Sequence, residues 1–321
     1  MAAARLDAGA AGRVAAGLEG RMGKRLRLQE PLVRHTAFRL GGPADLFAEV
    51  WTAAELAELY RLCAAEGLPV FLLGRGTNLL VRDGGFRGAV AVLGGDFEQI
   101  ARIGEQGGKM LLRAGGGVLN AQLVKYCHHN GLVGLEFLAL IPGTVGGAIR
   151  MNAGAHGSEI REFVDSADIV AADGRIETRS LDELGLSYRR SALAPGDAVA
   201  SVDLLVPPGD VGAARERMRE FSRHRTATQP LGEPNAGSVF KNPEKEFAGR
   251  LIEEAGLKGY RVGGARVSEL HANFIVGSTE ATAADVEAVI RHVRNKVFER
   301  TGIRLELEIR IIGEPAEGSE R

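Results

Sequence analysis

The sequence predicts an α+β protein of two or three compact units, and three observations support this prediction. Residues 44–73 follow a strand, helix, strand pattern and lead into the glycine turn GRGTNLLVRDGGF. Residues 97–206 are rich in strand patterns and contain Asp173-Gly174, a strong hairpin turn. Helical periodicity dominates after Pro207-Pro208-Gly209, where we expect a domain boundary. A chain of 321 residues is also too long for one simple core.

The first region is predicted from its helix start. Residues 44–50 read as a strand, and Thr52 follows with Glu55 three residues later, which is the capping-box pattern. Gly67 ends the helix, and residues 68–73 form a short apolar strand. One face of the helix is apolar and should be buried; it carries Leu56, Leu59, Tyr60 and Cys63.

The later regions contain segments with the two-residue hydrophobic period of strands and segments with the 3.6-residue period of helices. We expect strands at 109–113, around Ile169 and Ile176, and at 198–206, with a helix from Asn120 whose inner face carries Leu123, Val124 and Cys127. Helices follow at 211–224, 248–254 and 285–300. The last helix has an apolar face made of Val286, Val289, Ile290, Val293 and Val297.

Composition and charge exclude several classes of protein. Lys and Arg total 40 and Asp and Glu total 41, so the net charge is −1 and no broad surface for nucleic acid is expected. Cys63 and Cys127 lie in apolar helical patterns without CxxC spacing, and none of the seven histidines has a metal-ligand spacing. Residues 2–18 lack the unbroken apolar run of a signal peptide or membrane span. We therefore expect a cytoplasmic protein with no metal and no membrane contact. Separately, we expect it to be a monomer, although nothing in the sequence determines the oligomeric state.

Three glycine-dense loops suggest a long ligand. They are GRGTN at 74–78, IPGTVGGA at 141–148 and MNAGAHG at 151–157. The first has neither Rossmann nor P-loop spacing, because Leu79 stands where the third Rossmann glycine would be. A flavin dinucleotide needs several close backbone approaches, which glycine permits. Together the loops favour a flavin site, whereas any one alone reads as a tight turn.

Chemistry is most strongly indicated in NAGSVFKNP, residues 235–243. Ser238 stands behind Gly237, whose missing Cβ leaves room for a substrate, and ahead of Lys241 and Asn242. The alternative interpretation of this string is an ordinary turn before a strand.

Two further segments carry charged groups. Tyr188 and Arg189 in LSYRRSAL are suited to holding an anion, although such pairs are usually surface residues. The last segment, RLELEIRII, alternates strictly and predicts a strand at 304–312. Glu306, Glu308 and Arg310 then share one face, and alternation alone does not separate the two glutamates.

In this order, and together with AGLKGYRVGGARVSELHANFIV and LEIRIIG, the motifs closely resemble the UDP-N-acetylenolpyruvoylglucosamine reductase (MurB) family of bacterial peptidoglycan synthesis. The match runs from about residue 35 to residue 313. The resemblance implies an α+β fold with a two-part FAD-binding region of the vanillyl-alcohol oxidase type and a separate α+β substrate-binding domain. The implied parts are an N-terminal arm (1–34), FAD-binding parts (35–96 and 97–208), a substrate-binding domain (209–302), a last strand returning to the first part (303–313), and a tail (314–321).

The resemblance also implies a reaction. NADPH reduces FAD, and hydride then adds to the enolpyruvyl ether of a UDP-sugar, UDP-N-acetylglucosamine enolpyruvate, to give UDP-N-acetylmuramate. Arg189 would polarise the substrate carboxylate, Glu308 would assist it, and Ser238 would donate a proton. Glu308 is preferred over Glu306 because it stands two residues before the arginine of the family's terminal string.

The remaining site residues implied by the resemblance fall into two groups. Substrate or nicotinamide binding is assigned to Tyr188, Lys241 and Asn242. FAD binding is assigned to Gly74, Arg75, Gly76, Thr77, Asn78, Leu79, Pro142, Gly143, Thr144, Gly146, Gly147, Asn152, Ala153, Gly154 and, for a phosphate, Arg225. The sequence departs from the family pattern at Gly277, where asparagine is expected, and at His156, where relatives often have an aromatic residue.

Two alternatives remain open from the sequence. A flavin oxidase on the same scaffold would need a base at the flavin and often a histidine attached to it, and neither is evident. A non-catalytic module that binds a sugar nucleotide would not need Ser238, Arg189 and Glu308 together.

Overall fold

The computed structural model describes residues 8–316 and residue 318, which form two compact units. Unit 1 comprises the described residues up to 28, residues 45–74 and residues 88–223; unit 2 comprises residues 29–44 and 75–87 and the described residues from 224 onward. Residues 1–7 of the predicted arm, and residues 317 and 319–321 of the predicted tail, lie outside the described residues. The domain boundaries implied by the resemblance stay a prediction.

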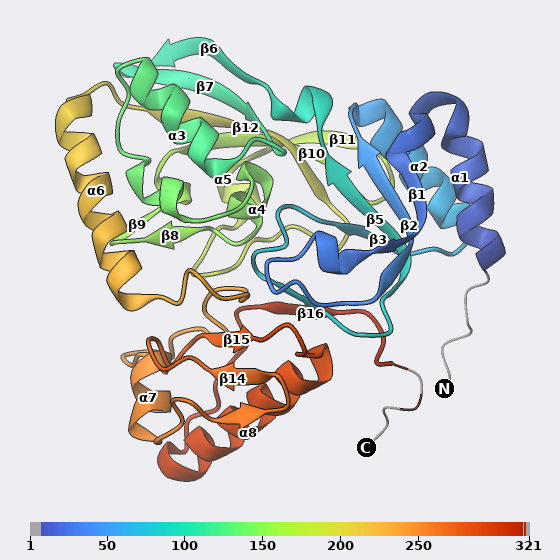
Figure 1. Cartoon of the computed structure of the whole chain (residues 1–321). Coiled ribbons are helices and arrows are strands. Elements are labelled where there is room, and N and C mark those ends of the chain that lie inside the picture. Colours follow the sequence, from blue (N-terminus) through green and yellow to red (C-terminus); the bar gives the residue numbers. More distant parts are fainter. Residues whose placement is uncertain (1–7, 317, 319–321) are drawn as a thin grey trace. The chain divides into compact units, whose positions relative to one another are not determined.

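The first sheet has the strand order β1 (Leu26–Pro31), β2 (Pro43–Val50), β5 (Phe86–Leu93) and β3 (Val70–Leu72), with β3 and β5 parallel. Helices α1 (Ala8–Met22) and α2 (Ala53–Ala65) lie side by side next to it (Figure 1). The hydroxyl of Thr52 accepts a hydrogen bond from the Glu55 amide, so the predicted helix start is confirmed. The predicted apolar face of α2 is also buried.

The second sheet of unit 1 is antiparallel throughout. Its order is β11 (Ile176–Ser180), β10 (Val164–Val170), β12 (Ala198–Val206), β7 (Lys109–Gly115) and β6 (Ile100–Gln106). The predicted turn at Asp173-Gly174 joins β10 to β11, with Gly174 at φ 86°. Three helical elements contribute to the core on this sheet: α3 (Asn120–His129), η4 (Glu136–Leu140) and α4 (Val145–Arg150) (Figure 1).

Two smaller elements complete unit 1. A two-stranded hairpin, β8 (Gly154–Ala155) and β9 (Ser158–Glu159), follows α4, and the short helix α5 (Leu181–Leu184) follows β11. Helix α6 (Val211–Thr228) contains the last passage of the chain from unit 1 to unit 2, after residue 223. The first turns of α6 belong to unit 1.

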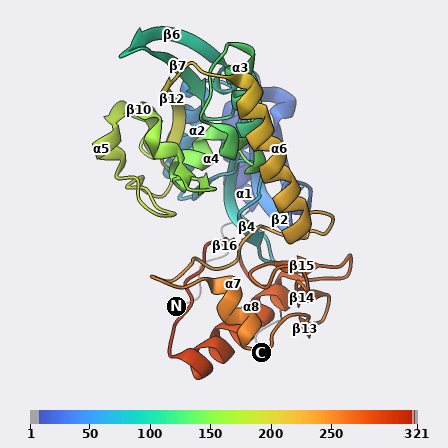
Figure 2. The same cartoon turned by 90° about the vertical axis from the view of Figure 1, so that its left-hand side faces the viewer.

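In unit 2, helices α7 (Ala248–Glu254) and α8 (Ala283–Thr301) pack with a three-stranded sheet, as Figure 2 shows. The sheet contains β13 (Arg261–Val262), β14 (Ala265–Val267) and β15 (Ile275–Gly277), all antiparallel. The five residues predicted for the apolar face of α8 are buried, as expected for an amphipathic helix. No helix in the described residues is long and apolar enough to cross a membrane.

The end of the chain is less regular than predicted. Only β16 (Arg310–Ile312) is a strand, and it pairs in parallel with β4 (Leu79–Val81). Burial still alternates, since Leu305 and Ile309 are buried while Arg304 and Glu306 are exposed. Residues 304–309 form no ladder: Leu307 makes a single bridge to Phe240, and the chain bends at Glu308 and Ile309. The prediction of one strand over 304–312 is wrong in length.

Asp83 joins the residues after β4 to the start of α8. Its two carboxylate oxygens accept hydrogen bonds from the Ala283 and Ala284 amides, at 2.9 and 3.1 Å. These amides belong to the first turn of the helix, which has no carbonyl partners of its own. The carboxylate also stabilises the positive end of the helix dipole.

We predict that Asp83→Ala lowers the free energy of unfolding by about 1 kcal/mol, the usual effect of losing a helix cap. Urea denaturation of the purified protein measures the change. Glu244→Ala, at an exposed position, is the control and should have little effect. Equal stability of the Asp83 variant and the wild type would contradict this role.

Candidate active site

Ser238 lies in a loop that begins with an asparagine turn. The Gly237 amide donates a hydrogen bond to the Asn235 side-chain oxygen at 2.9 Å. Gly237 has a φ of 77°, and a Cβ placed on it would meet nothing within 4 Å. The left-handed backbone explains the glycine at this position. A side chain here would not clash with the rest of the protein, so the structure shows no crowding that the glycine would relieve.

A buried carboxamide holds the residues that follow Ser238. Asn273 donates to the Phe240 carbonyl at 2.8 Å and accepts from the Phe240 amide at 3.0 Å. The Asn273 carbonyl accepts from the Val239 amide at 2.8 Å. Residues 239 and 240 lie in an irregular segment with no strand beside it in the part of the chain that the structure describes. Asn273 supplies the hydrogen-bond partners that a neighbouring strand would otherwise give to their backbone groups.

The C-terminal segment hydrogen bonds on its other side to the glycine turn. The Glu308 amide donates to the Val239 carbonyl at 2.8 Å, and the Glu308 carbonyl accepts from the Asn78 side chain at 3.1 Å. The Arg310 amide donates to the Asn78 carbonyl at 3.0 Å. Within unit 2 the structure therefore brings together three separately predicted segments, those of Asn78, Ser238 and Glu308.

Burial separates the two glutamates that alternation left equivalent. The Glu306 side chain is 77% exposed and lies 3.6 Å from the Lys241 ammonium, whereas Glu308 is half-buried. Asn242 also has a local partner, because its side-chain oxygen accepts from the Ala248 amide at the start of α7. Lys241 and Asn242 thus have roles within unit 2 besides their predicted part in binding.

In unit 1, Tyr188 and Arg189 form the centre of a tight turn. The backbones of Ser187 and Arg190 exchange two hydrogen bonds of 3.0 Å. Arg189 has a φ of 53°, a conformation that L-residues other than asparagine and aspartate rarely adopt. Its guanidinium donates to the Gly154 carbonyl at 2.8 Å and lies 5.1 Å from the centre of the Tyr188 ring. The geometry points the arginine along β8 at the expense of backbone strain.

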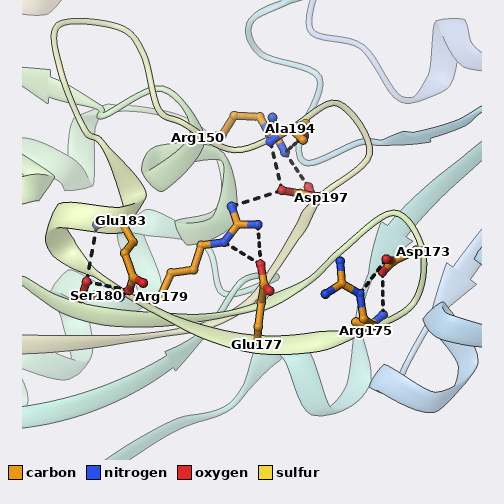
Figure 3. A network of polar contacts seen from close by, with 9 residues as sticks. All are labelled: Arg150, Asp173, Arg175, Glu177, Arg179, Ser180, Glu183, Ala194 and Asp197. Atoms are coloured by element: carbon orange, nitrogen blue, oxygen red, sulfur yellow. Dashed lines mark hydrogen bonds and ion pairs between the residues drawn. The ribbon is translucent and has the colours of Figure 1, made fainter.

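A polar network fixes the loop that follows this turn, as Figure 3 shows. Arg150, at the end of α4, donates to the Ala194 carbonyl at 3.2 Å and to the Asp197 carbonyl at 2.5 Å. The Asp197 carboxylate lies 3.3 Å from Arg179, which also pairs with Glu177. The helix after the second glycine loop is thereby joined to the segment after Arg189.

Two glycines of the predicted FAD loops allow protein backbones to approach one another. A Cβ on Gly76 would lie 2.2 Å from the His35 carbonyl oxygen, and one on Gly146 would lie 2.9 Å from the Gly116 carbonyl oxygen. The amides of Val145, Gly146 and Gly147 are bonded to the Val118 carbonyl, the Gly116 carbonyl and the Thr144 hydroxyl. The first turn of α4 therefore has its donors engaged by the protein itself.

Each unit, taken by itself, has one polar side chain that a polar ligand would stabilise. Asn120 donates to the Ile141 carbonyl at 2.9 Å, while its own side-chain oxygen is buried and has no hydrogen-bond partner among the described residues. In unit 2, burial lowers the pKa of the Arg225 guanidinium, whose Nε donates to the Gln229 side chain. An anion would stabilise the charged form of such a buried cation.

Cysteine and metal chemistry are not supported. Burial raises the pKa of both Cys63 and Cys127 to about 12, so each thiol stays protonated, and the prediction that they are core residues is confirmed. Within the described part of the chain, no group of three or more His, Cys, Asp and Glu residues could hold a metal ion.

Sequence reasoning missed two residues that organise the site. Asn273 lies in the quoted string HANF, but its bonds to Phe240 span 33 positions and have no local pattern. Glu159 begins a capping box with Glu162, which is a recognisable signal, and it also accepts a hydrogen bond from Asn152 at 2.8 Å.

Comparison with protein families gives two matches. Residues 44–180 match the FAD binding domain, and residues 229–312 match the C-terminal domain of UDP-N-acetylenolpyruvoylglucosamine reductase. Similar proteins include UDP-N-acetylenolpyruvoylglucosamine reductase 2 of Symbiobacterium thermophilum, 49% identical over 90% of this chain and 92% of the relative. The reductase of Geotalea uraniireducens is 44% identical over 90% of this chain and 94% of the relative.

A solved structure is also similar. The crystal structure of the reductase (MurB) from Thermus caldophilus has a TM-score of 0.76 and 36% identity, covering 90% of this chain and 98% of that chain. With the two family matches, this similarity confirms the predicted fold class, an α+β protein with an FAD-binding region and a separate C-terminal domain.

The hydrogen bond between His271 and Asn273 makes the stability of this segment depend on pH. Its Nδ1 accepts a hydrogen bond from the Asn273 amide at 3.2 Å, and burial lowers the pKa of the imidazole below its ordinary value of 6.5. The unfolded chain binds this proton as the pH falls through about 6.5, whereas the folded protein binds it only at lower pH. Protonation therefore favours unfolding, and the stability due to neutral His271 is lost as the pH falls through that window.

We predict that the wild type loses stability more steeply than His271→Asn as the pH falls below about 6.5. The asparagine oxygen can still accept from the amide two residues later, but it does not titrate. Urea denaturation at a series of pH values measures the slope, with His129→Asn, at an exposed position, as the control. The same slope in His271→Asn and the wild type would count against this prediction.

Proposed function

Because the chain belongs to the UDP-N-acetylenolpyruvoylglucosamine reductase family, we propose that it reduces UDP-N-acetylglucosamine enolpyruvate to UDP-N-acetylmuramate with electrons from NADPH. Family membership confirms the resemblance read from the motifs. It makes the chain an FAD-dependent oxidoreductase of peptidoglycan precursor synthesis, the enzyme also called UDP-N-acetylmuramate dehydrogenase. FAD and NADPH are the cofactors of this family.

The chemical problem is the charge that develops during reduction. FAD, when bound, supplies the hydride that adds to the methylene carbon of the enolpyruvyl ether. Negative charge then builds on the neighbouring carbon and spreads into the carboxylate. Fixed cationic or hydrogen-bonding groups are needed to stabilise this charge, and a proton donor is needed to complete the reduction.

We assign the stabilisation of the carboxylate to Arg189. A guanidinium is always charged near neutral pH and presents a planar pair of donors that matches a carboxylate. One terminal nitrogen is already held by the Gly154 carbonyl at 2.8 Å, so the side chain has little freedom left to lose when substrate binds. A strained backbone at this residue is also typical of functional positions.

The proton donor is assigned to Ser238, with Glu308 assisting the carboxylate. The observation that carries this assignment is the 2.8 Å hydrogen bond from the Glu308 amide to the Val239 carbonyl, which places Glu308 beside the Ser238 loop. A serine hydroxyl is a weak acid, but a carbanion-like carbon is basic enough to take its proton. To donate a hydrogen bond to the substrate carboxylate, Glu308 would have to be protonated.

We assign FAD to the three glycine loops and to Arg225. The half-buried guanidinium of Arg225, whose pKa burial lowers, would gain stabilisation from a cofactor phosphate. Tyr188, Lys241 and Asn242 are assigned to the substrate or the nicotinamide. In the cell, this activity would support wall growth, cell shape and division from the cytoplasm, and we propose that the enzyme acts as a monomer.

We predict that Ser238→Ala lowers product formation by about a hundredfold to a thousandfold, the usual effect of removing one well-placed catalytic group. Reduction of the bound flavin by NADPH should proceed at the wild-type rate, because that step needs no proton from Ser238. Anaerobic stopped-flow absorbance separates the two half-reactions. Ser222→Ala, on the exposed side of α6, is the control. Normal turnover in Ser238→Ala would exclude the serine as proton donor.

For cofactor binding, we predict that Arg225→Ala weakens FAD affinity by about tenfold to a hundredfold, as expected for one charge-assisted hydrogen bond to a phosphate. Flavin fluorescence during titration of the apoprotein gives the dissociation constant. Arg219→Ala removes an exposed arginine of the same helix, which pairs with Glu216, and should bind FAD normally. Unchanged affinity in Arg225→Ala would rule out its contact with the cofactor.

The oxidase alternative is tested with the same protein. An oxidase would turn over an alcohol with oxygen in the absence of NADPH. Oxygen-dependent turnover without NADPH, or a colourless protein that binds the sugar nucleotide without chemistry, would contradict the proposed function.

A further inference from the structure

Asn152 is a fully buried residue that hydrogen bonds both to the β8–β9 hairpin and to the turn that contains Arg189. It lies two residues after the end of α4, is 0% exposed and has a φ of 40°, in the left-handed region. Its side-chain nitrogen donates to the Glu159 carboxylate at 2.8 Å and to the Ser187 carbonyl at 3.2 Å. Its side-chain oxygen accepts from the Arg161 amide at 3.3 Å. Every polar atom of this side chain is therefore engaged within unit 1.

These bonds meet the Arg189 turn at two points. Ser187, whose carbonyl Asn152 holds, is the residue before Tyr188 and closes the tight turn through its hydrogen bonds with Arg190. Gly154, whose carbonyl holds the Arg189 guanidinium, pairs directly with Glu159 in the β8–β9 hairpin. Asn152 and Glu159 thus fix both the backbone before Arg189 and the acceptor of its side chain.

Glu159 is suited to this role because both its side chain and its backbone have hydrogen-bond partners. Its carboxylate accepts from the Asn152 side chain at 2.8 Å, and its own amide donates to the Glu162 carboxylate at 2.7 Å. A Cβ on Gly154 would lie 2.8 Å from the Glu159 Cγ, so the hairpin packs closely around the carboxylate. A half-buried carboxylate that is hydrogen bonded within a closely packed hairpin has a defined orientation.

We propose that Asn152 and Glu159 form a positioning pair that holds Arg189 in its strained, active conformation. This inference rests on the role of Arg189 given under the proposed function. It changes the expectation for Asn152: the enclosed side chain acts on Arg189 through Ser187 and the hairpin, and any effect of that side chain on the flavin is indirect. Holding the arginine costs strain, and the pair supplies the hydrogen bonds that offset it.

The test uses FAD-loaded enzyme and measures the two half-reactions separately. Asn152→Ala should slow re-oxidation of the reduced flavin by the enolpyruvyl substrate by about tenfold to a hundredfold, as expected for a small misplacement of a catalytic group. FAD content and reduction by NADPH should match the wild type. Loss of FAD, slower reduction by NADPH, or unchanged re-oxidation would overturn the inference.

Two variants of Glu159 separate positioning from loss of stability. Glu159→Gln keeps an oxygen for the Asn152 amide and should retain most of the activity, whereas Glu159→Ala should behave like Asn152→Ala. Glu162→Ala removes the other carboxylate of the same capping box without touching Asn152, and it is the matched control. If Glu162→Ala slowed re-oxidation as much as Glu159→Ala does, any loss of the Glu159–Glu162 capping interaction would have the same effect. That result would contradict a specific role for the Asn152–Glu159 pair.

A double-mutant cycle tests whether the pair acts through Arg189. In an Arg189→Lys background, Asn152→Ala should cause little further loss, because the group that it positions is already changed. Additive losses would overturn the inference. Arg189→Ala alone tests the proposed function: unchanged re-oxidation in that variant would refute the role of the arginine itself, whereas a slow Arg189→Ala with a normal Asn152→Ala would refute only the positioning pair.

Discussion

Unit 2 depends on the hydrogen bonds that residues 306–310 make on both of their sides. On one side they bond to the irregular Ser238 loop, and on the other they bond to Asn78 and lead into the parallel pairing of β16 with β4. Buried backbone groups must find partners, so an extended segment placed between two loops fixes the position of both. Three stretches, of which the first and the last lie 230 residues apart in the sequence, thereby share one framework within the unit.

In unit 1 the corresponding constraint is backbone strain held by side-chain hydrogen bonds. Arg189 and Asn152 both have positive φ values, which cost free energy in residues that have a Cβ. The neighbouring networks stabilise these conformations: one surrounds Asn152 and Glu159, and the other connects Arg150 to Asp197. Such strain is typical of sites where a side chain must stay oriented before the substrate arrives.

Patterns with a local physical cause were predictable from the sequence. The capping of α2 by Thr52, the apolar face of α8 and the hairpin at Asp173-Gly174 each depend on residues within a few positions, and all three are present. The irregular stretch at 304–309 was not predictable, because alternation describes burial but does not report whether the neighbouring segment is a strand. The positions of Asn273 and Glu159 depend on partners distant in the sequence or on burial, and the difference between Glu306 and Glu308 appears only when exposure is known.

The central claim is that bound FAD carries electrons from NADPH to an enolpyruvyl ether, and an anaerobic visible spectrum of the purified holoprotein tests it most directly. We expect the oxidised flavin bands to disappear when NADPH is added and to return when UDP-N-acetylglucosamine enolpyruvate follows, with UDP-N-acetylmuramate formed in an amount equal to the flavin re-oxidised. A flavin that stays reduced after the substrate is added, and recovers its bands only when oxygen is admitted, would contradict the account.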